Sequence, residues 1–113
     1  MLSKLYTRFT FANTLTRRSF AASSKIFNSS EEAVKDIKDG NTLLVGGFGI
    51  SGCPENLIRA IRKQGQKDLT VISNNCGIED VGLGLLLKNR QIKRMIASYV
   101  GENKDFEQQY LTG

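Results

Sequence analysis

The sequence predicts an α/β fold in which crossover helices cover a parallel sheet. Two short apolar runs, residues 42–45 and 69–73, lack polar alternation, as expected of strands buried on both faces of a parallel sheet. Each run leads into a loop rich in glycine or asparagine, and segments with helical periodicity separate the runs. Strands that alternate with helices through short loops indicate parallel pairing with right-handed crossovers.

The first predicted element is a helix near residues 30–37. Ser29 and Glu32 have capping-box spacing, and apolar residues follow at helical positions. The chain then turns at residues 38–40 and enters the first predicted strand, residues 42–45.

A crossover helix is predicted to begin at Pro54. As the first helical residue, proline loses nothing by its missing N–H. Leu57, Ile58 and Ile61 form one apolar face, and Gly65 ends the helix.

The rest of the chain predicts two more strands and two more helices. They are a strand at 69–73, a loop at 74–77, a short helix at 83–87, a partly buried strand at 92–100, and a helix at 102–111 with Phe106 and Tyr110 on one face. No internal sequence repeat is evident after residue 30.

The first thirty residues differ in composition from the rest of the chain. They contain five basic residues, ten Ser or Thr and no acidic residue, whereas residues 31–113 contain eleven residues of each sign. The formal net charge of +5 therefore lies in this leader, and the high pI indicates no nucleic-acid-binding surface on the folded part.

This leader has the pattern of a mitochondrial transit peptide, with apolar residues interleaved among cations. We assign residues 1–28 to the transit peptide and a disordered leader, with cleavage near Ala21 after Arg17-Arg18 and a destination in the mitochondrial matrix. The alternative is a disordered basic tail with another use.

Composition also excludes several kinds of site. No stretch of about 20 apolar residues is present to span a membrane. Two cysteines and no histidine cannot form a structural zinc site, and the lack of histidine removes Ser-His and Cys-His mechanisms within this chain. Cys53 and Cys76 are therefore expected to be free, small buried residues, with no metal bound.

The glycine-rich loop at residues 46–54 follows the first predicted strand, at the edge where open α/β sheets bind ligands. Gly47, Gly49 and Gly52 match the fingerprint of a dinucleotide site. Such a site also expects an acidic residue about 20 residues further on, to hold the ribose. The chain has Ser73-Asn74-Asn75 there, so the dinucleotide match is weak.

A longer pattern gives a second interpretation of the same loop. Residues 39–54 read Asp-Gly, two residues, three apolar residues, Gly-Gly-Phe, three residues, Gly, one residue, Pro. This string resembles the first signature of the CoA transferases of the ketone-body type. The resemblance extends over about residues 31–113 through the segments 56–58, 73–75, 82–87, 91–95 and 98–103.

The resemblance implies transfer of CoA from succinyl-CoA to a 3-oxoacid such as acetoacetate, through a glutamyl-CoA thioester. The CoA thioester is a substrate, and no cofactor is expected. In this family the nucleophilic Glu belongs to the second half of the enzyme, and no residue of this chain can be matched to it. No catalytic residue is therefore expected here, and the implied partners are a C-terminal half or a full-length subunit of a homodimer.

The resemblance also implies which residues face the cleft between the two halves. They are Gly46, Gly47, Phe48, Gly49, Gly52, Asn74 and Asn75. Loop amides and asparagine side chains can donate hydrogen bonds to a substrate carboxylate or an oxyanion. The alternative role of the same residues is a tight turn and a loop cap.

Residues 29–113 are expected to be a partial N-terminal domain. Three strands leave much of a parallel sheet uncovered, and small domains bury proportionally little surface. The interpretations left open are an N-terminal portion of a transferase, a truncated product without catalysis, and a dinucleotide-binding domain.

Overall fold

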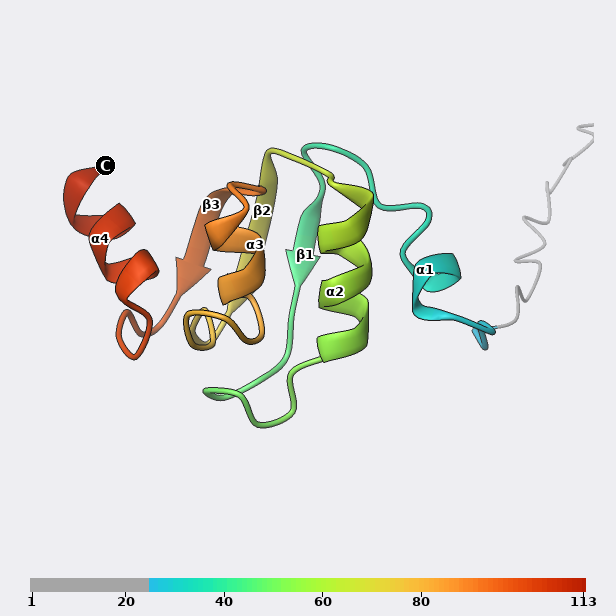
Figure 1. The fold of residues 1–113 in the computed structure, drawn as a ribbon, viewed down its shortest axis with the longest axis horizontal. Helices are drawn as coiled ribbons and strands as arrows, with labels where there is room; N and C mark the ends of the chain where they lie inside the picture. The colour runs from blue at the N-terminus through green and yellow to red at the C-terminus, as the bar shows by residue number, and fades with distance from the viewer. Residues whose placement is uncertain (1–24) are drawn as a thin grey trace, which may run out of the picture.

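The computed structural model describes residues 25–113, which form a three-stranded parallel sheet and four helices (Figure 1). This arrangement confirms the α/β fold class predicted from the sequence. The predicted transit peptide and its cleavage site lie outside the described residues, apart from residues 25–28.

The strands follow one another across the sheet in the order β1 (Thr42–Leu44), β2 (Leu69–Ser73) and β3 (Ile92–Ala97). Both pairs are parallel. β3 ends three residues before its predicted end at residue 100, because the backbone N–H groups of Ser98 and Tyr99 turn to donate to the Asn74 carbonyl oxygen. The sequence pattern contains no signal for that contact between loops.

α1 (Ser30–Ala33) is shorter than the helix predicted at 30–37. Half of the predicted capping box forms, since Ser29 Oγ accepts a hydrogen bond from Glu32 N at 3.1 Å, whereas Glu32 Oε2 accepts from Asn28 N instead of Ser29 N. After Ala33 the chain tightens into turns, in which Ile37 N donates to Val34 O instead of continuing the helix.

α2 (Glu55–Gln64) ends at Gly65, as predicted, with that glycine in the left-handed conformation at φ +79°. Pro54 occupies the N-cap position, so the prediction that it is the first helical residue is wrong by one position. The buried face of α2 consists of Ile58, Ala60 and Ile61, whereas Leu57 remains exposed.

The last two helices also begin later than predicted. α3 spans Gly84–Lys88, and α4 spans Lys104–Thr112 because Asn103 is its N-cap. Phe106 and Tyr110 line the same hollow beside β3, which agrees with their predicted common face. Phe106 is buried in the core, while Tyr110 is exposed.

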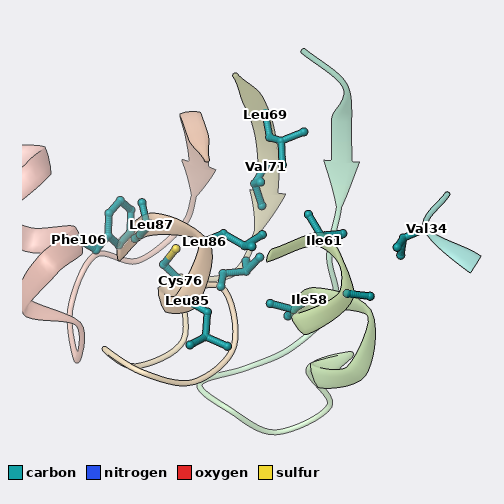
Figure 2. Packing of buried hydrophobic residues seen from close by; sticks show 12 residues of the cluster. Val34, Ile58, Ile61, Leu69, Val71, Cys76, Leu85, Leu86, Leu87 and Phe106 are labelled. Carbon is teal, nitrogen blue, oxygen red and sulfur yellow. The ribbon is translucent and has the colours of Figure 1, made fainter. Parts of the chain in front are cut away.

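The core lies where α2 and α3 pack on one face of the sheet (Figure 2). Leu69 and Val71 of β2 point into it and meet Ile58 of α2 and Leu86 of α3, all of which are almost completely buried. The prediction that the first two strands are buried on both faces is wrong for β1, whereas β2 is buried on one face and half-buried on the other. On the opposite face, the strand register aligns Leu44, Ile72 and Ile96, and Leu44 is 80% exposed.

None of the helices in residues 25–113 is long and apolar enough to cross a membrane. Within the same residues, no cluster of His, Cys, Asp and Glu side chains could hold a metal ion.

Burial raises the pKa of the Cys76 thiol from the ordinary value of 9.0 to about 12. The folded chain therefore keeps a proton that the unfolded chain loses above about pH 9. The contribution of the protonated thiol to the free energy of unfolding is fully present below about pH 9. It is lost between about pH 9 and pH 12, at about 1.4 kcal/mol per pH unit. Urea unfolding at pH 8 and pH 10 measures this loss. The Cys76→Ala variant should lack this component, and equal pH slopes in the two proteins would contradict the prediction.

Candidate functional site

The carboxyl ends of the three parallel strands meet at one edge of the sheet, and a loop follows each strand. These loops enclose a cavity of about 340 Å³. It is lined by Phe48 and Gly49 after β1, Asn74 and Asn75 after β2, and Tyr99 and Glu102 after β3. All three loops therefore contribute to one site, at the edge where open α/β sheets bind ligands.

The loop after β1 contains a tight turn that the glycines make possible. The backbones of Phe48 and Ser51 exchange two hydrogen bonds, of 2.9 and 3.0 Å. Gly47 has a φ of +137°, and a Cβ at this position would lie 2.5 Å from Cys53 Sγ. The turn leaves the Phe48 side chain 77% exposed at the cavity.

A turn of the same construction follows β2. Gly47 and Gly52 flank the first turn, and Gly77 and Gly82, with φ of +67° and +64°, flank the second. Within the second turn, Ile78 and Val81 form a bridge like that of Phe48 and Ser51. The sequence shows no repeat because the two turns share only their glycine spacing.

Hydrogen bonds join the loops after β2 and β3. The Asn74 carbonyl oxygen accepts from Ser98 N at 3.1 Å and from Tyr99 N at 3.2 Å. The Asn74 side chain donates to Ser98 Oγ at 2.9 Å, and Asn103 Nδ2 donates to Cys76 O at 3.4 Å. In the described part of the chain, no hydrogen bond joins residues 46–52 to either of these loops.

The two asparagine side chains of the cavity keep donor capacity. Asn74 Nδ2 uses one N–H on Ser98 Oγ and retains its second. Asn75 Oδ1 accepts from Gly77 N at 3.3 Å, which leaves both N–H groups of Asn75 Nδ2 without a partner among residues 25–113. The wall after β2 therefore offers amide donors to an oxygen atom in the cavity.

The structure divides the sequence-predicted site residues into two groups. Phe48, Gly49, Asn74 and Asn75 line the cavity together, whereas Gly46, Gly47 and Gly52 shape the first loop without lining it. Tyr99 and Glu102 also line the cavity, but they were assigned to a strand and a helix, respectively. The signal that could have found them is the segment 98–103, which carries part of the resemblance stated above and contains both residues.

Cys53 and Glu55 lie behind the first loop, where α2 begins. The pKa of Cys53 is raised by burial and, to a smaller degree, by the negative charge of Glu55, so this thiol remains protonated near neutral pH. Both carboxylate oxygens of Glu55 are buried without a hydrogen-bond partner, and Arg59 lies 3.9 Å from one of them. Glu55 occupies the first turn of α2, where a negative charge complements the helix dipole.

The family model described as "Coenzyme A transferase" matches residues 27–113. One relative is a subunit of the "Probable succinyl-CoA:3-ketoacid coenzyme A transferase" of Bacillus subtilis strain 168. It is 67% identical over 89 residues, which cover 79% of this chain and 37% of the relative. The corresponding subunit of the Helicobacter pylori J99 "Succinyl-CoA:3-ketoacid coenzyme A transferase" is 57% identical over 90 residues, or 80% of this chain and 39% of the relative.

The human "Succinyl-CoA:3-ketoacid coenzyme A transferase 2, mitochondrial" is 53% identical over 100 residues, which cover 85% of this chain and 19% of that protein. The chain thus spans less than two fifths of the length of these three relatives. The family match favours the CoA-transferase interpretation of the glycine-rich loop over the dinucleotide interpretation. On these grounds the chain belongs to the coenzyme A transferase family.

Proposed function

We propose that this chain supplies an acyl-binding part of an enzyme that moves CoA from succinyl-CoA to a 3-oxoacid such as acetoacetate. The observation that carries the proposal is the cavity at the carboxyl edge of the sheet, with the Asn74 and Asn75 amides in its wall. The bacterial relatives, whose names specify succinyl-CoA and a 3-ketoacid, support the choice of substrates.

The proposed chemistry needs a carboxylate nucleophile, which we place in a part of the enzyme outside this chain. A glutamate attacks the thioester carbonyl of succinyl-CoA, CoA leaves as a thiolate, and a mixed anhydride remains. The thiolate then attacks the glutamyl carbonyl and releases succinate, which leaves an enzyme thioester. The acceptor acid reverses these two steps and departs as its CoA thioester.

The proposed work of this chain is to bind the acid and its developing charge. Each tetrahedral intermediate places negative charge on one oxygen, and preorganised amide donors stabilise that charge. The side chains of Asn74 and Asn75 have N–H groups available to donate hydrogen bonds, and the aromatic rings of Phe48 and Tyr99 provide an apolar lining for a short acyl chain. The route requires no cofactor or metal ion, since the CoA thioester is itself a substrate.

The proposal extends to partners and location. We assign residues 29–113 to a partial N-terminal domain that works beside the nucleophile-bearing half, in a homodimer of the complete enzyme. Residues 1–28 would direct it to the mitochondrial matrix. The basic, acid-free leader supports this location, as do the human and rat relatives whose names include "mitochondrial".

CoA exchange between succinyl-CoA and acetoacetate tests the proposal. The full 113-residue chain is assayed alone, beside a chimera in which residues 27–113 replace the matched segment of the Bacillus subtilis relative. The chimera is assembled with the subunit that carries the nucleophile. We expect transfer by the chimera and none by the chain alone. A folded, assembled chimera without transfer would contradict the proposal, and transfer by the chain alone would contradict the placement of the nucleophile.

Within that chimera, Asn74→Ala and Asn75→Ala test the proposed donors. Loss of an oxyanion donor lowers kcat by about 10²–10³. We expect at least one of the two variants to show a loss of this order, with a smaller change in KM. Asn56→Ala is the matched control, because Asn56 is exposed on α2, away from the cavity. If both cavity variants retain the kcat of the control, neither asparagine is a donor in the reaction.

A further inference from the structure

Tyr99 is the aromatic residue that the loop after β3 contributes to the cavity, and its ring folds back over Gly101. A Cβ on Gly101 would lie 2.5 Å from Tyr99 Oη, 2.6 Å from Cζ and 3.0 Å from Cε1. The phenol therefore occupies the space that a side chain at position 101 would fill. Gly101 itself is buried, while Tyr99 remains 50% exposed.

The backbone gives no other reason for glycine at this position. Gly47, Gly49 and Gly77 have positive φ, which side chains disfavour, but Gly101 does not. Its nearest neighbours at the Cβ position are three atoms of the Tyr99 ring, and no backbone atom is among them. Alanine at position 101 would therefore conflict first with the Tyr99 side chain.

The backbone on both sides of the contact is held in place. Tyr99 N donates to Asn74 O at 3.2 Å, and Asn103 donates from its side chain to Cys76 O. Movement of the loop therefore cannot easily relieve the steric overlap that a methyl group at position 101 would cause. The side chain that can yield is the half-exposed Tyr99, whose displacement changes the cavity wall.

We propose that Gly101 is a positioning residue that holds Tyr99 against the cavity wall, where the tyrosine ring contacts the short-chain acid substrate. The inference rests on the proposed function and adds to it the residue that fixes one wall of the acid site. Gly101 touches no substrate and acts through Tyr99.

The test compares Gly101→Ala in three backgrounds of the active chimera. Displacing Tyr99 weakens acid binding by about the free energy of one contact. KM for acetoacetate should therefore rise roughly threefold to tenfold, with kcat changed less than about twofold. In a Tyr99→Ala background the three atoms nearest this methyl group are gone, so Gly101→Ala should have a much smaller further effect. In a Tyr99→Phe background the ring remains, and the effect of Gly101→Ala should persist.

A purely structural defect of the loop would give a different pattern. It would lower kcat or stability by the same factor in all three backgrounds, and that result would overturn the proposal. An unchanged KM in Gly101→Ala would overturn it as well. If Gly101→Ala fails to fold, the proposal requires the Tyr99→Ala/Gly101→Ala double variant to fold, and failure of both would count against it.

A measurement that needs no activity separates this inference from the proposed function. In the full chain, nuclear Overhauser contacts between the Tyr99 ring protons and the Gly101 α-protons are expected, together with a ring-current shift of those α-protons. Tyr99→Leu should abolish the ring-current shift. An inactive chimera with these signals present would contradict the proposed function alone, whereas their absence would overturn the positioning role directly.

Discussion

Replacing Gly84 with alanine is expected to lower the free energy of unfolding by about 3 kcal/mol, as overpacking of a buried site does. Gly84 is the buried first residue of α3. A Cβ there would overlap the carbonyl oxygen of Ile78 and would lie 2.9 Å from both Glu79 O and Asn103 Nδ2. Two of these three atoms belong to the backbone, which cannot swing aside as a surface side chain can. Urea unfolding of the full chain, followed by circular dichroism, measures the change.

Gly46→Ala is the matched control for Gly84→Ala. A Cβ on Gly46 would have no heavy atom within 4 Å, and its φ lies outside the left-handed region. This variant is expected to leave stability unchanged or to raise it by up to about 1 kcal/mol, because alanine reduces the entropy of the unfolded chain. Equal losses in the two variants would show that close packing at Gly84 is not the cause.

The Asn103→Ala variant is expected to be less stable by a similar amount, about 3 kcal/mol. Asn103 is completely buried and has two roles. Its Oδ1 accepts from Phe106 N at 3.0 Å as the N-cap of α4, and its Nδ2 donates to Cys76 O. Loss of an N-cap costs about 1 kcal/mol, and a buried carbonyl left without a partner costs about 1–3 kcal/mol.

Two further variants separate these contributions. Asn103→Ser keeps an oxygen for the N-cap but has no amide to donate to Cys76 O, so it should lose about half as much stability. Ser29→Ala removes a solvent-exposed N-cap of α1 and should cost about 1 kcal/mol or less. If Asn103→Ala costs no more than Ser29→Ala, the bond to Cys76 O contributes nothing measurable.

Much of the fold could be predicted because its signals are local. The apolar run predicted at 69–73 has the same bounds as β2, Ser29 is the N-cap of α1, and Gly65 ends α2. Each of these features depends on residues within a few positions of one another. The predicted end of β3 is wrong because it depends on Asn74, which lies more than twenty residues away along the chain.

The candidate site could be predicted only in part, for a related reason. The glycine pattern and the two asparagines mark loops that follow strands, and the resemblance to the CoA transferases implies that Phe48, Gly49, Asn74 and Asn75 face a cleft there, where the structure brings them together. Whether a glycine lines the cavity or only shapes the loop depends on backbone angles. Tyr99 belongs to the site because β3 lies next to β2 and its loop folds back on Asn74, and neither fact follows from spacing along the sequence.

Hydrogen bonds join the loops after β2 and β3, whereas none joins either loop to residues 46–52 in the described chain. From this difference we expect the two walls of the cavity to differ in their dynamics. Loops without such ties move on timescales of nanoseconds to microseconds. We therefore expect Phe48 and Gly49 to fluctuate against a preorganised wall formed by Asn74, Asn75 and Tyr99. A ligand that closes the first loop would have to remove conformational entropy from a segment rich in glycine, the residue that loses most on ordering. Affinity at this site would thus depend as much on how freely residues 46–52 move before binding as on the contacts made afterwards.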